Sequence, residues 1–93
     1  MELNLQEIRK DLDAIDSQII DLFSRRMRLV KNVAEYKKEH GLPVLDAGRE
    51  ETILNRVSEK AGEALAPYAR RVYETMFAVS REYQAERLKG GEQ

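Results

Sequence analysis

The first forty residues carry an apolar repeat that no glycine or proline interrupts. Its spacings of three and four residues are those of one face of an α-helix. The repeat comprises Leu5, Ile8, Leu12, Ile15, Ile19, Leu22, Leu29, Val33 and Tyr36. Gly41 suits the position just beyond a helix C-terminus, and Pro43 follows it. The pattern predicts one helix over about residues 5–39, roughly 50 Å long.

A helix of that length is too long for the chain that contains it. The chain has 93 residues, enough for one domain, and a compact chain of this size is only about 25–30 Å across. The helix must therefore protrude, and two shorter helices of the same chain cannot cover all of its apolar face. A second copy of the chain is the simplest cover, so we expect a homodimer.

The remainder of the sequence predicts two further helices and no strand. Asp46 is a good N-cap for a helix over residues 47–61. Pro67 suits the first turn of a helix over about residues 67–88. The tail at 89–93 is expected to fray. The expected fold is all-α, with three helices in a single domain spanning residues 1–93.

Composition excludes several classes of function. The 16 Lys and Arg residues are balanced by 17 Asp and Glu, which argues against nucleic-acid binding driven by bulk charge. There is no Cys and only one His, so we expect no metal site. The acidic residues 1–4 do not resemble a signal peptide, and the longest apolar run, residues 76–79, is far too short to span a membrane. We therefore expect a cytoplasmic protein.

Polar side chains occupy positions where the helical patterns call for apolar ones. Arg26 interrupts the long repeat, and Arg9 and Lys37 lie in the column beside it. Such side chains can extend to solvent, but a guanidinium buried without a partner is costly. On the third helix one stripe comprises Tyr73, Phe77, Ser80 and Gln84. Its two polar members either make core hydrogen bonds, turn toward solvent or contact a ligand.

The spacing of these cations limits how they can be grouped. Arg26 and Lys37 share a helix face about 16 Å apart, within reach of one small ligand. Arg9 is about 25 Å from Arg26 along the same helix, so only the partner's Arg9 could reach that ligand. Arg49, in the first turn of the second helix, is either another such cation or a solvent-exposed charge. The sequence thus permits an anion site shared by two chains, suited to a dicarboxylate or a phosphate ester.

Several segments resemble the all-α, or type II, chorismate mutases. They are residues 5–16 (LQEIRKDLDAID), 22–26 (LFSRR), 33–37 (VAEYK) and 43–46 (PVLD), then Arg49 with Glu50, and Ser80 with Gln84. The resemblance covers about residues 5–88, and the order and spacing of the segments make it specific.

This resemblance implies a fold, a reaction and a set of site residues. It implies an intertwined homodimer that isomerises chorismate to prephenate by a Claisen rearrangement, without a cofactor, on the way to Phe and Tyr. One chain would supply Arg26, Lys37, Asp46, Arg49, Glu50, Ser80 and Gln84, and the other chain Arg9.

The resemblance also implies a role for each residue. Arg26 and the partner's Arg9 would clamp the two carboxylates, and Ser80 would hydrogen-bond one of them. Lys37 and Gln84 would donate to the ether oxygen, so that Lys37, Gln84 and Arg26 form the catalytic set. The ring hydroxyl would be held by Asp46, Arg49 and Glu50, which would also brace one another.

Two alternatives stay open at this point. An isochorismate–pyruvate lyase shares this fold and a similar cationic site, and product identification would separate the two enzymes. A non-catalytic helical dimerisation or regulatory module would need only the long helix. Such a module would gain stability from an apolar residue in place of Arg26.

Overall fold

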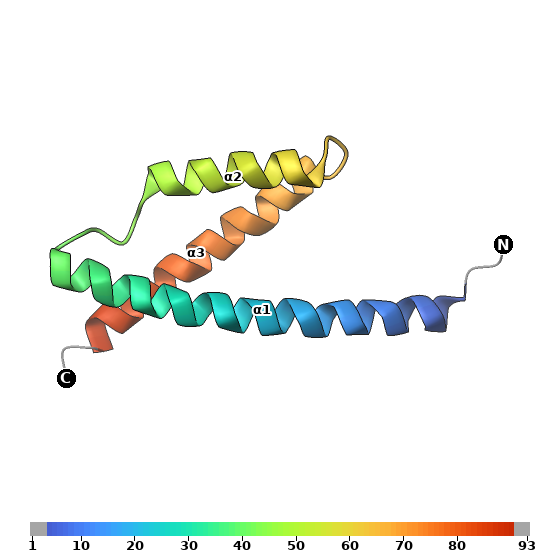
Figure 1. The fold of residues 1–93 in the computed structure, drawn as a ribbon, viewed down its shortest axis with the longest axis horizontal. Helices are drawn as coiled ribbons and strands as arrows, with labels where there is room; N and C mark the ends of the chain where they lie inside the picture. The colour runs from blue at the N-terminus through green and yellow to red at the C-terminus, as the bar shows by residue number, and fades with distance from the viewer. Residues whose placement is uncertain (1–3, 91–93) are drawn as a thin grey trace.

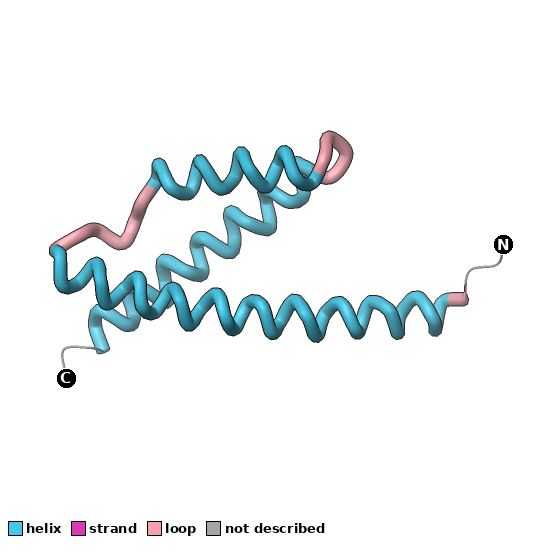
Figure 2. Tube along the Cα trace, viewed as in Figure 1, coloured by secondary structure: helices cyan, strands magenta, loops and turns pink. Residues whose placement is uncertain are grey.

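The computed structural model describes residues 4–90 and consists of three helices. They are α1 (Leu5–His40), α2 (Ala47–Ala61) and α3 (Ala66–Gly90), joined by short loops (Figures 1 and 2). Residues 4–90 contain no strand. The predicted all-α fold with a long first helix is confirmed.

Both ends of α1 are closed by local hydrogen bonds. The Asn4 side chain accepts from the backbone N–H groups of Gln6 and Glu7, at 2.9 and 3.3 Å, which satisfies donors that lack a partner within the helix. Gly41 follows the last turn with φ at 64°, a left-handed conformation that glycine adopts without steric cost. The α1 helix ends one residue later than the sequence predicts.

The other two helices begin next to the residues that the sequence singles out, Asp46 and Pro67. The Asp46 carboxylate caps α2 by accepting from the backbone N–H of Arg49 at 3.1 Å. Pro67 lies in the first turn of α3, which starts one residue earlier than expected. The helix continues through residues 89 and 90, where a frayed tail was the wrong prediction. Residues 91–93 lie outside the described range. So do residues 1–3, which belong to the N-terminal segment that we expect not to be a signal peptide.

The α3 helix holds the structure together. It packs against α1 and against α2, whereas the backbones of α1 and α2 do not approach each other closely within residues 4–90. Figure 1 shows α3 crossing obliquely from the end of α2 toward the C-terminal end of α1. The buried apolar residues are few, namely Ala34, Leu54 and Phe77, one from each helix. The position of α2 relative to α1 is therefore set through α3.

The N-terminal half of α1 extends away from this packing. The described structure measures 58 × 29 × 14 Å, and its radius of gyration is 17.0 Å, against about 12 Å for a compact chain of this length. Leu5, Leu12, Ile19 and Leu22 each keep between 52 and 58% of their surface exposed. The protrusion predicted from the sequence is confirmed. None of the helices within residues 4–90 has the length and apolar character needed to cross a membrane.

Candidate functional site

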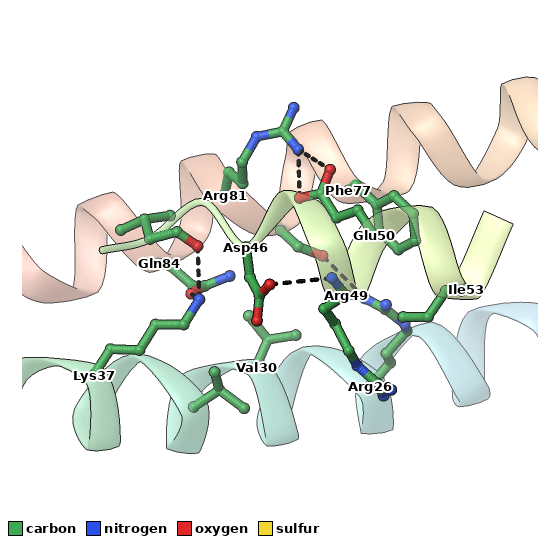
Figure 3. A pocket seen from close by; sticks show the side chains of 13 residues that line it. Arg26, Val30, Lys37, Asp46, Arg49, Glu50, Ile53, Phe77, Arg81 and Gln84 are labelled. Atoms are coloured by element: carbon green, nitrogen blue, oxygen red, sulfur yellow. Dashed lines mark hydrogen bonds and ion pairs between the residues drawn. The ribbon is translucent and has the colours of Figure 1, made fainter. Parts of the chain in front are cut away.

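A pocket of about 270 Å³ lies where the three helices approach one another (Figure 3). Seven of the eight predicted site residues line it, namely Arg26, Lys37, Asp46, Arg49, Glu50, Ser80 and Gln84. Its apolar wall comes from Val30, Val33, Val44, Ile53 and Phe77. The structure thus gathers residues that lie up to 58 positions apart in the sequence.

Arg26 is partnered rather than extended into solvent. Its guanidinium donates to the Ser80 hydroxyl at 3.0 Å and lies 5.8 Å from the centre of the Phe77 ring. Ser80 is only 5% exposed. A guanidinium carries more N–H donors than this one bond uses, so Arg26 retains donors for an anion in the pocket.

Lys37 and Gln84 form a second polar pair. The Lys37 ammonium donates to the Gln84 side-chain oxygen at 2.9 Å and to the Val44 carbonyl at 2.6 Å. An ammonium can only donate, so it fixes the orientation of the amide and leaves the Gln84 NH₂ group free to donate elsewhere. Gln84 is 7% exposed. Ser80 and Gln84 thus both face a hydrogen-bond donor, and neither turns toward solvent.

The first turn of α2 forms the acidic side of the pocket. Asp46 caps the helix through the Arg49 backbone, while the Arg49 side chain stays exposed. The expected mutual bracing is only partly seen, because Glu50 pairs with Arg81 of α3 and not with Arg49. Both Glu50 oxygens lie 2.6 Å from the same Arg81 nitrogen.

Among the charged residues of the described range that line the pocket, Arg81 is the one that the sequence did not predict. It follows Phe77 by four positions and precedes Gln84 by three, so it belongs to the same helix face. That spacing could have identified it. However, a charged residue among other polar residues of a helix usually lies on a solvent-exposed face, so Arg81 by itself did not indicate a site.

Arg9 is the predicted site residue that does not line the pocket. It lies on the exposed N-terminal part of α1, seventeen residues before Arg26, which corresponds to about 25 Å along the helix. Its role therefore stays a prediction that requires a second chain.

The charge of the pocket suits a small anion. Four cationic side chains, Arg26, Lys37, Arg49 and Arg81, face two carboxylates, Asp46 and Glu50. The excess is two positive charges, carried by groups that can form several hydrogen bonds at once. Within residues 4–90 no cluster of three or more His, Cys, Asp or Glu side chains is arranged to hold a metal ion.

Comparisons with known proteins point to one family. The chain is 42% identical over 59 residues to the chorismate mutase of Methanocaldococcus jannaschii, covering 63% of this chain and 60% of the relative. It is 36% identical over 59 residues to the 4-amino-4-deoxychorismate mutase of Streptomyces venezuelae, covering 63% and 57%. These matches span about three fifths of each relative.

A solved structure and a family profile agree with these relatives. A conserved hypothetical protein from Pyrococcus furiosus superposes with a TM-score of 0.75 at 33% identity, covering 90% of this chain and 99% of that one. The profile of the chorismate mutase type II family matches residues 8–85, which is most of the chain. The resemblance noted from the sequence is thereby confirmed, and the chain belongs to the chorismate mutase type II family.

Proposed function

We propose that the protein is a chorismate mutase, which isomerises chorismate to prephenate on the route to Phe and Tyr. The observation that carries the proposal is the pairing of Arg26 with Ser80 and of Lys37 with Gln84 in one cationic pocket. The reaction is an intramolecular rearrangement that transfers no proton and forms no covalent adduct. A pocket that combines positioning with hydrogen-bond donation is sufficient for it.

Positioning begins with the two carboxylates of the substrate. The enolpyruvyl arm must fold over the ring before the new carbon–carbon bond can form. In our proposal Arg26 binds one carboxylate and the partner's Arg9 binds the other, each fixing orientation as well as charge. Because the Ser80 oxygen accepts from Arg26, the Ser80 hydroxyl hydrogen is free to donate to a carboxylate.

Rate acceleration comes from donors that face the breaking C–O bond. Negative charge grows on the ether oxygen as that bond lengthens. In our proposal the Lys37 ammonium and the Gln84 NH₂ group donate to this oxygen, more strongly in the transition state than in the ground state. The Lys37–Gln84 hydrogen bond supports this assignment, since it holds the two donors side by side before substrate binds.

The complete site in this proposal belongs to a homodimer. The exposed apolar face of α1 supports a second chain as its cover. Because Arg9 is too far from the pocket of its own chain, the second chain would also supply Arg9 to that pocket. Asp46, Arg49 and Glu50 would hold the ring hydroxyl at the α2 side of the pocket.

A chorismate-consumption assay with product identification tests the proposal. Prephenate as the product supports it. Salicylate and pyruvate from isochorismate would instead identify the lyase. No turnover of either compound, together with no binding of a bicyclic transition-state analogue, would indicate a non-catalytic helical module.

A further inference from the structure

The Glu50–Arg81 pair joins two helices inside the pocket. Both side chains line the pocket and both are partly buried, with 23% of Glu50 and 34% of Arg81 exposed. The Arg81 nitrogen contacts both carboxylate oxygens at 2.6 Å (Figure 3). Glu50 therefore meets any ligand as one half of a neutral pair, not as a free anion.

A second pair between the same two helices provides a contrast. Arg70 of α3 and Glu51 of α2 approach only to 3.9 Å, and 63% of the Glu51 side chain is exposed. Neither residue lines the pocket. The shorter and less exposed of these two ion pairs is therefore the one that lies in the pocket, where it can act on a bound ligand.

The effect of the pair on a ligand depends on what a paired carboxylate can accept. Each carboxylate oxygen has two acceptor positions, so Glu50 can accept from a neutral hydroxyl while it binds Arg81. An ammonium at the same place would gain from Glu50 but would be repelled by the Arg81 guanidinium nearby. The pair thus favours a neutral donor over a cationic one.

We propose that Arg81 is a specificity-determining residue, which neutralises Glu50 and so makes the pocket select a ring hydroxyl over a ring ammonium. This inference rests on the proposed function, because it assigns Glu50 to the ring substituent of a chorismate-like substrate. It names the chemical feature by which chorismate would be distinguished from an analogue that carries an amine in place of the hydroxyl.

The test compares two substrates on matched variants at pH 6.5, where an aliphatic amine is protonated. The ratio of kcat/KM for chorismate to kcat/KM for 4-amino-4-deoxychorismate is measured for wild type, Arg81→Met, Arg81→Lys and Arg70→Met. Wild type should favour chorismate. Arg81→Met should move the ratio toward the amino compound by about tenfold. Arg81→Lys keeps the charge and should retain the wild-type ratio. Arg70→Met removes the outer ion pair and the Arg70–Ser58 hydrogen bond, both away from the pocket, and should also retain it.

A double variant separates the electrostatic effect from a general disturbance of the pocket. Adding Glu50→Gln to Arg81→Met removes the carboxylate that would attract the ammonium, so the ratio should return toward that of wild type. An equal loss of kcat/KM for both substrates in Arg81→Met would overturn the inference and leave the proposed function standing. Wild type that prefers the amino compound would also overturn it. Wild type that converts neither compound would overturn the proposed function and, with it, the inference.

Discussion

At the scale of single residues, the charge of Lys37 is the feature that the proposed chemistry most requires. Lys37→Ala should lower kcat by about 10²–10³-fold, because a donor to the developing oxyanion is lost. Steady-state kinetics measures the loss, and circular dichroism with sedimentation checks that the variant keeps the fold and the oligomeric state of wild type. Lys38→Ala, which alters an exposed neighbour, is the control and should keep normal turnover. Near-normal turnover in Lys37→Ala would remove Lys37 from the catalytic set.

Arg26 tests the positioning part of the mechanism. Arg26→Ala should abolish most of the proposed activity while the protein stays folded, since a substrate carboxylate loses its guanidinium and Ser80 loses its donor. Arg28→Ala, an exposed residue on the opposite side of α1, serves as the control. An Arg26→Ala variant with wild-type kcat/KM would show that the guanidinium has only a structural role.

Gln84 makes a prediction about pH. An amide does not titrate, so the donor at this position should persist through neutral and mildly basic pH. In Gln84→Glu the carboxyl group can donate only while it is protonated, and activity should shift toward acidic pH. The profile of kcat/KM against pH measures the shift. Superimposable profiles for wild type and Gln84→Glu would contradict the role of Gln84 as donor.

At the scale of helices, both the stability of the fold and the site depend on how α1 and α2 pack against α3. Leu54 of α2 is 8% exposed and does not line the pocket. Leu54→Ala should lower the free energy of unfolding by about 2–4 kcal/mol through lost burial and a new cavity. Leu45→Ala, at a residue that is 54% exposed, should cost much less. Urea denaturation measures both values, and equal costs would mean that Leu54 is not a core residue.

The helices were the part of the fold that the sequence predicted best. The features that predicted them are local in the sequence, and each has a physical explanation. They are the apolar repeat of α1, the Asp46 cap of α2 and Gly41 at the end of α1. Arg26 was recognisable because one polar residue breaks an otherwise apolar repeat.

Contacts between helices were harder to predict than the helices themselves. Arg81 resembles any solvated charge until α2 is laid against α3, and only that packing brings Glu50 to it. The pairing of Lys37 with Gln84 likewise depends on how α1 crosses α3. Those crossings arise from long-range packing, which a single helix pattern does not encode.

At the scale of the whole molecule, the exposed half of α1 predicts how the proposed dimer can be disrupted. Ile15→Asp places a charge on the apolar face, whereas Ser17→Asp places the same charge on the opposite side of the helix. The first variant should sediment as a monomer and lose activity, because Arg9 no longer reaches a pocket. The second should remain dimeric and active. An active monomer would refute a site built from two chains.

The distance between Arg9 and the pocket has a genetic consequence. If each pocket takes Arg9 from the other chain, Arg9→Ala removes a residue from the partner chain's pocket. Lys37→Ala instead removes a residue from the pocket of the chain that carries it. A hybrid of the two inactive variants then contains one pocket with both defects and one with neither. Refolding equal amounts together should restore about one quarter of wild-type activity, since half of the assemblies are hybrids with one intact pocket each. Two alleles that each encode an inactive variant would thus complement each other.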